Sequence, residues 1–108
     1  MSKYIDQESA LKRVGGSEAL YKRLLGKFVD GNYQAQLEDL IAAKDAAGAA
    51  AQAHTIKGVA ANLSLLEINV ISQKLEMALK NGEPYDSLVT ELRAATEATI
   101  NEINSILM

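Results

Sequence analysis

The chain has no cysteine, no tryptophan and a single proline, and only 5% of its 108 residues are aromatic. The absence of cysteine excludes disulfides, zinc–thiolate sites, cysteine nucleophiles and covalently attached c-type haem. Runs of β-branched or aromatic residues are scarce, whereas alanine, the strongest helix former, is abundant. The composition therefore favours an all-α protein.

Positive charge and long apolar runs are scarce as well. The net charge is −3 and the isoelectric point is about 5.1, which argues against nucleic acid as the main partner because phosphate backbones are bound by cationic surfaces. No run reaches the roughly 18 apolar residues that span a bilayer, no basic cluster suits a membrane surface, and the N-terminal residues lack the apolar core of a signal peptide. We therefore expect a soluble, cytoplasmic protein with no membrane contact.

Glycine and proline divide the chain into helical segments. Gly15-Gly16 ends a short helix of about residues 6–14, and Ser17 is placed to cap the next helix. Apolar residues on the two sides of Gly31-Asn32 would face opposite sides of one straight helix, so we expect a kink or break there. Further helices are expected from the cap Asp45 to about Leu63, over 66–80 and over 84–107, where Pro84 would start the last one.

Short connections make the later helices antiparallel neighbours. The sequence therefore predicts an antiparallel four-helix bundle with a short additional N-terminal helix. A length of 108 residues is typical of one domain, and we expect a single domain over residues 1–108.

The only histidine, His54, lies in the segment AHTIKGVAANL, and histidine is the one residue type whose ordinary pKa lies near neutral pH. On a helical wheel of residues 46–63 it points about 140° away from the expected core face. That core face is formed by Ala49, Ala53, Ile56, Ala60 and Leu63, with Val59 beside them. The neighbours of His54 on the outer face are small: Ala47, Ala50, Ala51, Gly58 and Ala61. Lys57 lies at the border of this patch.

Gly58 needs an explanation, because glycine inside a helix costs about 1 kcal/mol relative to alanine. One interpretation is that a larger residue would stop a partner protein from reaching His54. The other is that Gly58 marks close packing between helices in an alanine-rich chain. The wheel alone leaves both interpretations open.

Other uses of a lone histidine find little support. No second ligand lies at metal-binding spacing on the same helix, and no nucleophile elbow accompanies the histidine. The chain also lacks a glycine-rich phosphate-binding loop, so nothing in it resembles an ATP site.

The segment from Ala53 to Leu63 resembles the His-x-Leu/Ile-Lys-Gly motif of histidine phosphotransfer (HPt) domains, and the likeness extends along nearly the whole chain. Two positions depart from the family pattern. Ser64 stands where glycine is common, and Val59 stands where serine or alanine is common.

The resemblance implies a phosphocarrier without an ATP site of its own. His54 would accept a phosphoryl group from the phospho-aspartate of a receiver domain and pass it to the aspartate of another receiver. The partners would be response-regulator receiver domains and a hybrid sensor kinase, and the receiver would supply the Mg²⁺ because this chain is expected to bind no cofactor or metal. Lys57 would offset the negative charge of the phosphoryl group, and Gly58 would leave room for the partner.

On the following helix, Gln73, Glu76 and Lys80 lie at steps of three and four residues, away from the apolar positions, and are candidates to flank the phosphorylated histidine. The resemblance implies such a place for Glu76 and Lys80. The alternative is a solvated helical face with ordinary Glu-Lys pairing four residues apart. The small residues around His54 would form the docking surface, together with adjoining apolar residues from the N-terminal helix, and we expect a monomer. That docking set is Ala47, Ala50, Ala51 and Ala61.

Two alternatives to a phosphocarrier remain at this stage. The chain could be a helical adaptor that binds receiver or kinase domains without accepting phosphate, with His54 incidental. A metal-dependent or phosphatase-like enzyme on the same bundle would need a second catalytic group beside the imidazole, and no sequence feature supplies one convincingly.

Overall fold

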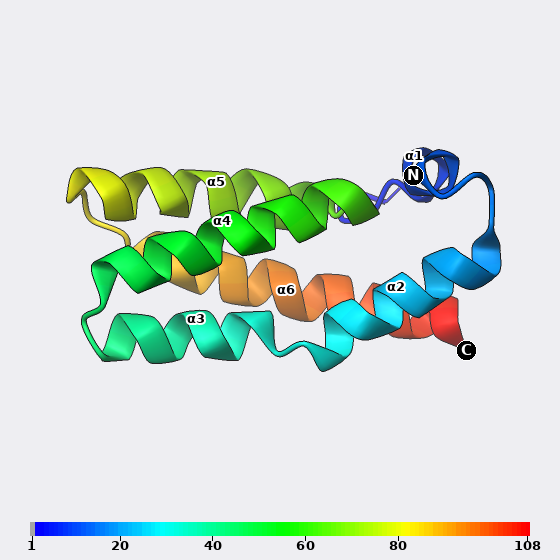
Figure 1. Ribbon diagram of the computed structural model, residues 1–108. Coiled ribbons are helices and arrows are strands. Elements are labelled where there is room, and N and C mark those ends of the chain that lie inside the picture. Colours follow the sequence, from blue (N-terminus) through cyan, green and yellow to red (C-terminus); the bar gives the residue numbers. More distant parts are fainter. Residues whose placement is uncertain (1) are drawn as a thin grey trace.

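The computed structural model describes residues 2–108 and shows a helical rod of 41 × 20 × 20 Å (Figure 1). The described residues form six helices, with bounds α1 Gln7–Arg13, α2 Glu18–Asp30, α3 Tyr33–Ala42, α4 Ala46–Leu63, α5 Leu66–Asn81 and α6 Asp86–Leu107. The expected all-α class is confirmed. Residue 1 of the expected domain lies outside the described part of the chain.

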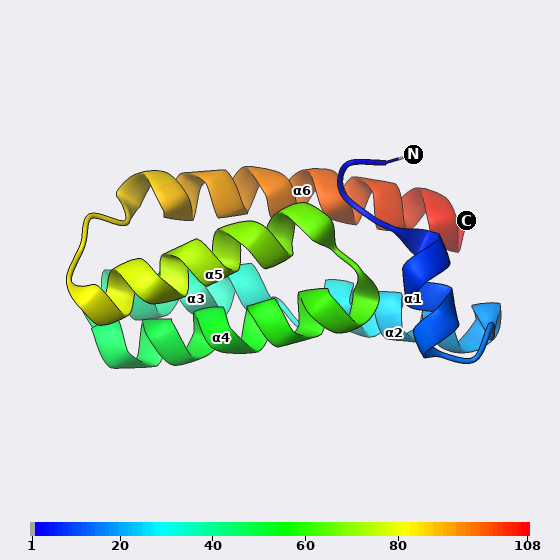
Figure 2. The ribbon, with the colours of Figure 1, turned by 90° about the horizontal axis from the view of Figure 1, so that it is seen from above.

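Helices α3, α4, α5 and α6 lie side by side and run in alternating directions (Figures 1 and 2). Helix α4 packs against α3 and α5, and α6 packs against the same two helices from the opposite side. Helix α2 extends the line of α3 and packs on α6 and α4. Helix α1 lies across the end of the rod, beside the turn between α4 and α5.

Hydrogen bonds to side chains start three of the helices where the sequence places them. Asp6 accepts from the Ser9 N–H at 3.2 Å, and Ser17 accepts from the Leu20 N–H at 3.2 Å. Asp45 begins α4 by accepting from the Gly48 N–H at 2.9 Å. Each bond satisfies a backbone donor that the first helical turn leaves free.

The break between α2 and α3 falls at the predicted position. Asn32 has φ of +52°, a left-handed conformation that asparagine tolerates better than most residues. The rings of Phe28 and Tyr33 stack across the break with centroids 5.5 Å apart. Two consecutive helices, α2 and α3, therefore lie end to end along one edge of the bundle, where the other edges have one helix each.

The start of the last helix differs from the prediction. Pro84 was expected to begin it, but α6 begins at Asp86 and Tyr85 is its N-cap with φ of −134°. The Tyr85 side chain is partly buried and packs against the core, so the two residues before α6 belong to the connection from α5 and not to the helix.

Apolar side chains at the predicted spacing form the core between the helices. The predicted core face of α4 is buried, and Val59 beside it is half-buried. Helices α5 and α6 also bury apolar residues at helical spacing, among them Ile68, Leu75, Leu92 and Ile103. Helix α3 contributes only Leu37 as a fully buried residue. This core fixes the rotation of α4 and therefore the outward direction of His54.

Replacing Lys44 with glycine is expected to stabilise the fold by about 0.5–1 kcal/mol. Lys44 follows α3 with φ of +59°, and its N–H donates to the Ile41 carbonyl at 3.0 Å in the turn that ends the helix. Glycine reaches this conformation without the steric cost of a Cβ. Urea denaturation tests the prediction, with Lys44→Ala as the control that keeps the Cβ. An equal or lower midpoint for the glycine variant would contradict it.

Candidate functional site

The site is built on the outer face of α4. The His54 side chain is 66% exposed, and its ring lies in the direction that the helical spacing predicts. Neighbouring turns of α4 pack through Ala53 and Ile56 into the core, with exposed fractions of 0% and 2%. The histidine is therefore held on a rigid helix while its ring remains accessible to another protein.

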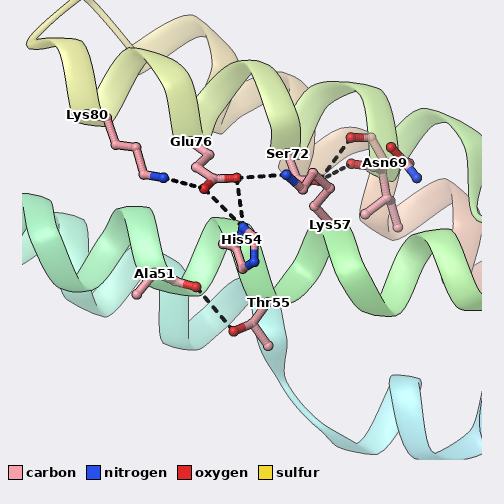
Figure 3. Close-up of polar contacts among 9 residues, drawn as sticks. Ala51, His54, Thr55, Lys57, Asn69, Ser72, Glu76 and Lys80 are labelled. Atoms are coloured by element: carbon pink, nitrogen blue, oxygen red, sulfur yellow. Dashed lines mark hydrogen bonds and ion pairs between the residues drawn. The ribbon is translucent and has the colours of Figure 1, made fainter.

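Glu76 of α5 reaches across to the histidine (Figure 3). Its side chain is only 7% exposed, and its carboxylate lies 3.1 and 3.3 Å from His54 Nδ1. Lys57 Nζ lies 3.2 Å from one carboxylate oxygen, and Lys80 Nζ lies 2.8 Å from the other. One buried carboxylate thus joins the histidine to two lysines, one from each helix.

These contacts keep Glu76 ionised. The hydrogen bond from Lys80, and then the charge and hydrogen bond of Lys57, lower the pKa of Glu76 from 4.5 to about 2 although its burial acts in the opposite direction. At neutral pH the carboxylate can therefore only accept hydrogen bonds, so Nδ1 of His54 must be the donor. In the neutral imidazole, the lone pair then lies on Nε2, which points away from Glu76 (Figure 3).

Open space surrounds Gly58, one turn after His54. A Cβ built at this position meets no atom within 4 Å outside the local helix backbone and the neighbouring residues. Helix packing therefore does not require glycine here, and that interpretation of the sequence is wrong. The remaining interpretation is that glycine leaves room here for a partner protein to reach His54.

Gly58→Ala is expected to raise the stability of the chain by about 0.5–1 kcal/mol. The expectation follows because the methyl group meets open space and alanine is the better helix former. Thermal or urea unfolding measures the change. A destabilised alanine variant would show that the glycine has a structural role after all.

The predicted docking alanines are only partly accessible. Ala47 and Ala51 are exposed and Ala61 is half-buried. Ala50 is buried, with an exposed fraction of 5%, so its place in the docking surface is wrong. The reason is that α5 packs closely along this side of α4, which widens the buried arc beyond the stripe that the wheel assigns to the core.

The three candidate residues on α5 do not all lie beside His54. Glu76 and Lys80 form the expected pair four residues apart, but Glu76 is buried rather than solvated. Gln73 lies exposed on the same helix, outside the group of ion pairs. The structure thus brings His54, Lys57, Glu76 and Lys80 together and leaves Gln73 apart.

An apolar groove of about 390 Å³ lies on the other side of α4, between this helix and α1 and α2. Val59 and Asn62 of α4 line it, together with Leu24 of α2, and Arg13 and Lys27 supply its positive charges. Val59 is five residues beyond His54, which corresponds to about 7.5 Å along the helix axis. The sequence indicates apolar residues near the site but does not reveal that they form a groove.

Comparison with known proteins identifies the family. A family model described as "Hpt domain" matches residues 25–102, which include the whole of α4 and α5. The chain belongs to the Hpt domain family. Neither the comparison with curated proteins nor that with solved structures finds a match.

Hpt domains are helical phosphocarrier modules that carry out histidine phosphotransfer in two-component phosphorelays, and they interact there with receiver domains and kinases. Two further findings concern residues 2–108. None of their helices is both long and apolar enough to cross a bilayer. Nor do their His, Cys, Asp and Glu side chains form a group of three or more that could hold a metal ion.

Proposed function

We propose that His54 is the phosphorylated residue of this Hpt domain. The observation that supports this most strongly is the hydrogen bond between Nδ1 and the buried, ionised Glu76. It leaves an exposed Nε2 with a free lone pair, which is what a nucleophile at this position needs. An incidental surface histidine would not require a buried carboxylate with two lysines beneath it.

The transfer starts with attack of the Nε2 lone pair on the phosphorus of a receiver's phospho-aspartate. The P–O bond to the aspartate breaks, the aspartate leaves as a carboxylate, and an N–P bond forms. Positive charge develops on the imidazole during the attack, and Glu76 offsets it through the Nδ1–H. The reverse attack by the aspartate of a second receiver removes the phosphoryl group.

Lys57 and Lys80 are proposed to balance the charge of the phosphorylated state. A phosphoryl group adds about −2 at neutral pH, and the two ammonium groups are close to the ring because Glu76 holds them there. Lys57 is 30% exposed and Lys80 61% exposed, so both are accessible from the surface that a partner would cover. Mg²⁺ is proposed to come with the receiver domain.

The receiver is proposed to dock over His54, Gly58 and Ala51 and to extend into the groove beside Val59. We expect the chain to act as a monomer in the cytoplasm, between the receiver of a hybrid sensor kinase and a response regulator. The exposed side of α4 next to Gly58 carries no long side chain that would block this approach.

Incubation with purified receiver domains, phosphorylated by acetyl phosphate and Mg²⁺, tests the proposal. The wild type should acquire an acid-labile, base-stable phosphate, and His54→Gln should acquire none. Labelling of the glutamine variant would refute the role of His54. Binding of a receiver without labelling of either protein would favour the adaptor.

A further inference from the structure

Apolar side chains project into solvent along the outer side of α5, next to the proposed phosphorylation site. Three of the exposed large apolar residues of residues 2–108 lie on this helix: Leu66, Val70 and Met77, with exposed fractions of 39%, 52% and 55%. Their spacing of four and seven residues places them on one side of the helix. We refer to these three residues as the α5 stripe.

Nothing in the bundle accounts for this stripe. The buried residues of α5 include Ile68, Leu75 and Leu79, which face the core on the other side of the helix. Glu76 and Lys80 lie between the core and the stripe, on the side turned toward His54. The exposed Gln73 lies between Val70 and Met77 on this side of the helix, so the α5 stripe is an interrupted row of apolar side chains. Its exposed apolar surface lies beside the proposed site, where another molecule could cover it.

We propose that the α5 stripe is part of the docking surface for the receiver domain that exchanges phosphate with His54. The inference rests on the proposed function. It adds that the receiver contacts α5 through apolar side chains, as well as approaching α4 across its small residues.

The size of the interface supports this placement. A transient signalling contact buries about 600 Å² on each partner, which corresponds to a circular patch with a radius of about 14 Å. Met77 adjoins Glu76, whose carboxylate touches the imidazole. Val70 is six residues from Glu76, or about 9 Å along α5. Met77 and Val70 are turned about 100–120° round α5 from Glu76, so a receiver centred on Nε2 has to extend over the outer side of α5 to contact them. A patch of this radius is wide enough to do so, whereas Leu66 lies at the rim.

Charge supports the same occupant. Between Val70 and Lys80 the exposed charged residues of α5 are Lys74 and Lys80, whereas Glu76 is buried and paired with lysines. The half-buried Glu67 lies at the far end of the stripe, beside Leu66. A receiver presents a phospho-aspartate and the carboxylates that hold Mg²⁺, all of which are acidic. An apolar stripe flanked by lysines suits this partner through both hydrophobic burial and charge.

Kinetics with two phosphodonors test the proposal. The first donor is the receiver domain that labels the wild type fastest in a purified panel, phosphorylated with acetyl phosphate and Mg²⁺. The second is phosphoramidate, a small molecule whose P–N bond breaks with loss of ammonia and which needs no docking surface. The variants are Val70→Ser, Met77→Ser and their combination, all at exposed positions.

The double variant should need about tenfold more phospho-receiver for half-maximal rate, as expected when two central apolar contacts are lost. Its rate with phosphoramidate should stay within twofold of the wild type. Leu107→Ser is the matched control, because Leu107 is 38% exposed and lies on α6, diagonally across the bundle from α4. This control should behave as the wild type with both donors.

An unchanged half-saturating receiver concentration in the double variant would overturn the inference while leaving the role of His54 intact. So would a wild-type dimer that dissociates in the double variant, since the stripe would then serve self-association, which sedimentation velocity detects. If neither donor labels the wild type, the proposed function fails and the inference fails with it.

Discussion

Gly58→Gln is expected to slow phosphoryl transfer from a receiver to His54 by at least about 100-fold. The glutamine side chain would start one turn beyond His54 and lean toward the N-terminal end of α4, where the imidazole lies. It would occupy the open space that the structure shows at this position. In-line transfer depends on placement of the reacting atoms, and a displacement of about 1 Å can cost 100-fold in rate.

Single-turnover transfer from a phosphorylated receiver measures this effect. Gly58→Ala should retain most of the rate because a methyl group meets no atom within 4 Å. Ala94→Gln, at an exposed position on α6, controls for a new glutamine elsewhere on the surface. Transfer by Gly58→Gln at more than a tenth of the wild-type rate would refute the steric role of the glycine.

Glu76→Gln is expected to lower the free energy of unfolding by about 1–3 kcal/mol at pH 7. The hydrogen bond from Lys80, together with the contacts of Lys57, lowers the pKa of Glu76 to about 2 in the folded chain, against an ordinary value of 4.5. A carboxyl group with a lowered pKa contributes its full stabilisation above its unfolded-state pKa. It loses this contribution as the pH falls toward the folded-state pKa.

The difference in stability between wild type and Glu76→Gln should therefore be largest above pH 5 and should shrink between about pH 4.5 and 2. Urea denaturation of both proteins at several pH values across this range measures it. Lys80→Met is a useful companion, because it removes the contact with the largest effect on the pKa of Glu76 and should raise that pKa. A difference that stays constant down to pH 2 would show that the ion pairs do not stabilise the fold.

Two substitutions of Glu76 should distinguish the effect of its charge from its effect on the orientation of the imidazole. Glutamine keeps a carbonyl oxygen that can accept from Nδ1–H, whereas leucine removes the acceptor altogether. We expect Glu76→Leu to slow labelling by phosphoramidate more than Glu76→Gln does. Nitrogen NMR of the unphosphorylated imidazole should show the Nδ1–H tautomer weakened only in the leucine variant. Equal rates and equal spectra would contradict a positioning role for Glu76.

Much of the bundle could be predicted because the period of its apolar residues is local information. The core positions of α4, such as Ile56 and Leu63, follow from spacing alone, and so does the outward direction of His54. The caps Ser17 and Asp45 carry their own chemistry in the sequence. These features require no knowledge of how the helices pack.

The features that the sequence did not reveal depend on contacts between helices. Glu76 resembles any glutamate on a solvated face, and it is buried only because α5 lies against α4 and two lysines compensate its charge. The burial of Ala50 escapes the helical wheel for a related reason, because the wheel contains no neighbouring helix. The groove beside Val59 requires three helices to meet, which no single-helix pattern describes.

The position of the phosphoryl group on the labelled protein tests the central claim most directly. After incubation with the phosphorylated receiver, mass spectrometry of peptides and phosphorus–nitrogen NMR coupling identify the residue and the ring atom. We predict one phosphoryl group per chain, on Nε2 of His54, with Nδ1 still protonated and hydrogen-bonded to Glu76. Phosphate on Nδ1, or on any other residue, would contradict the account.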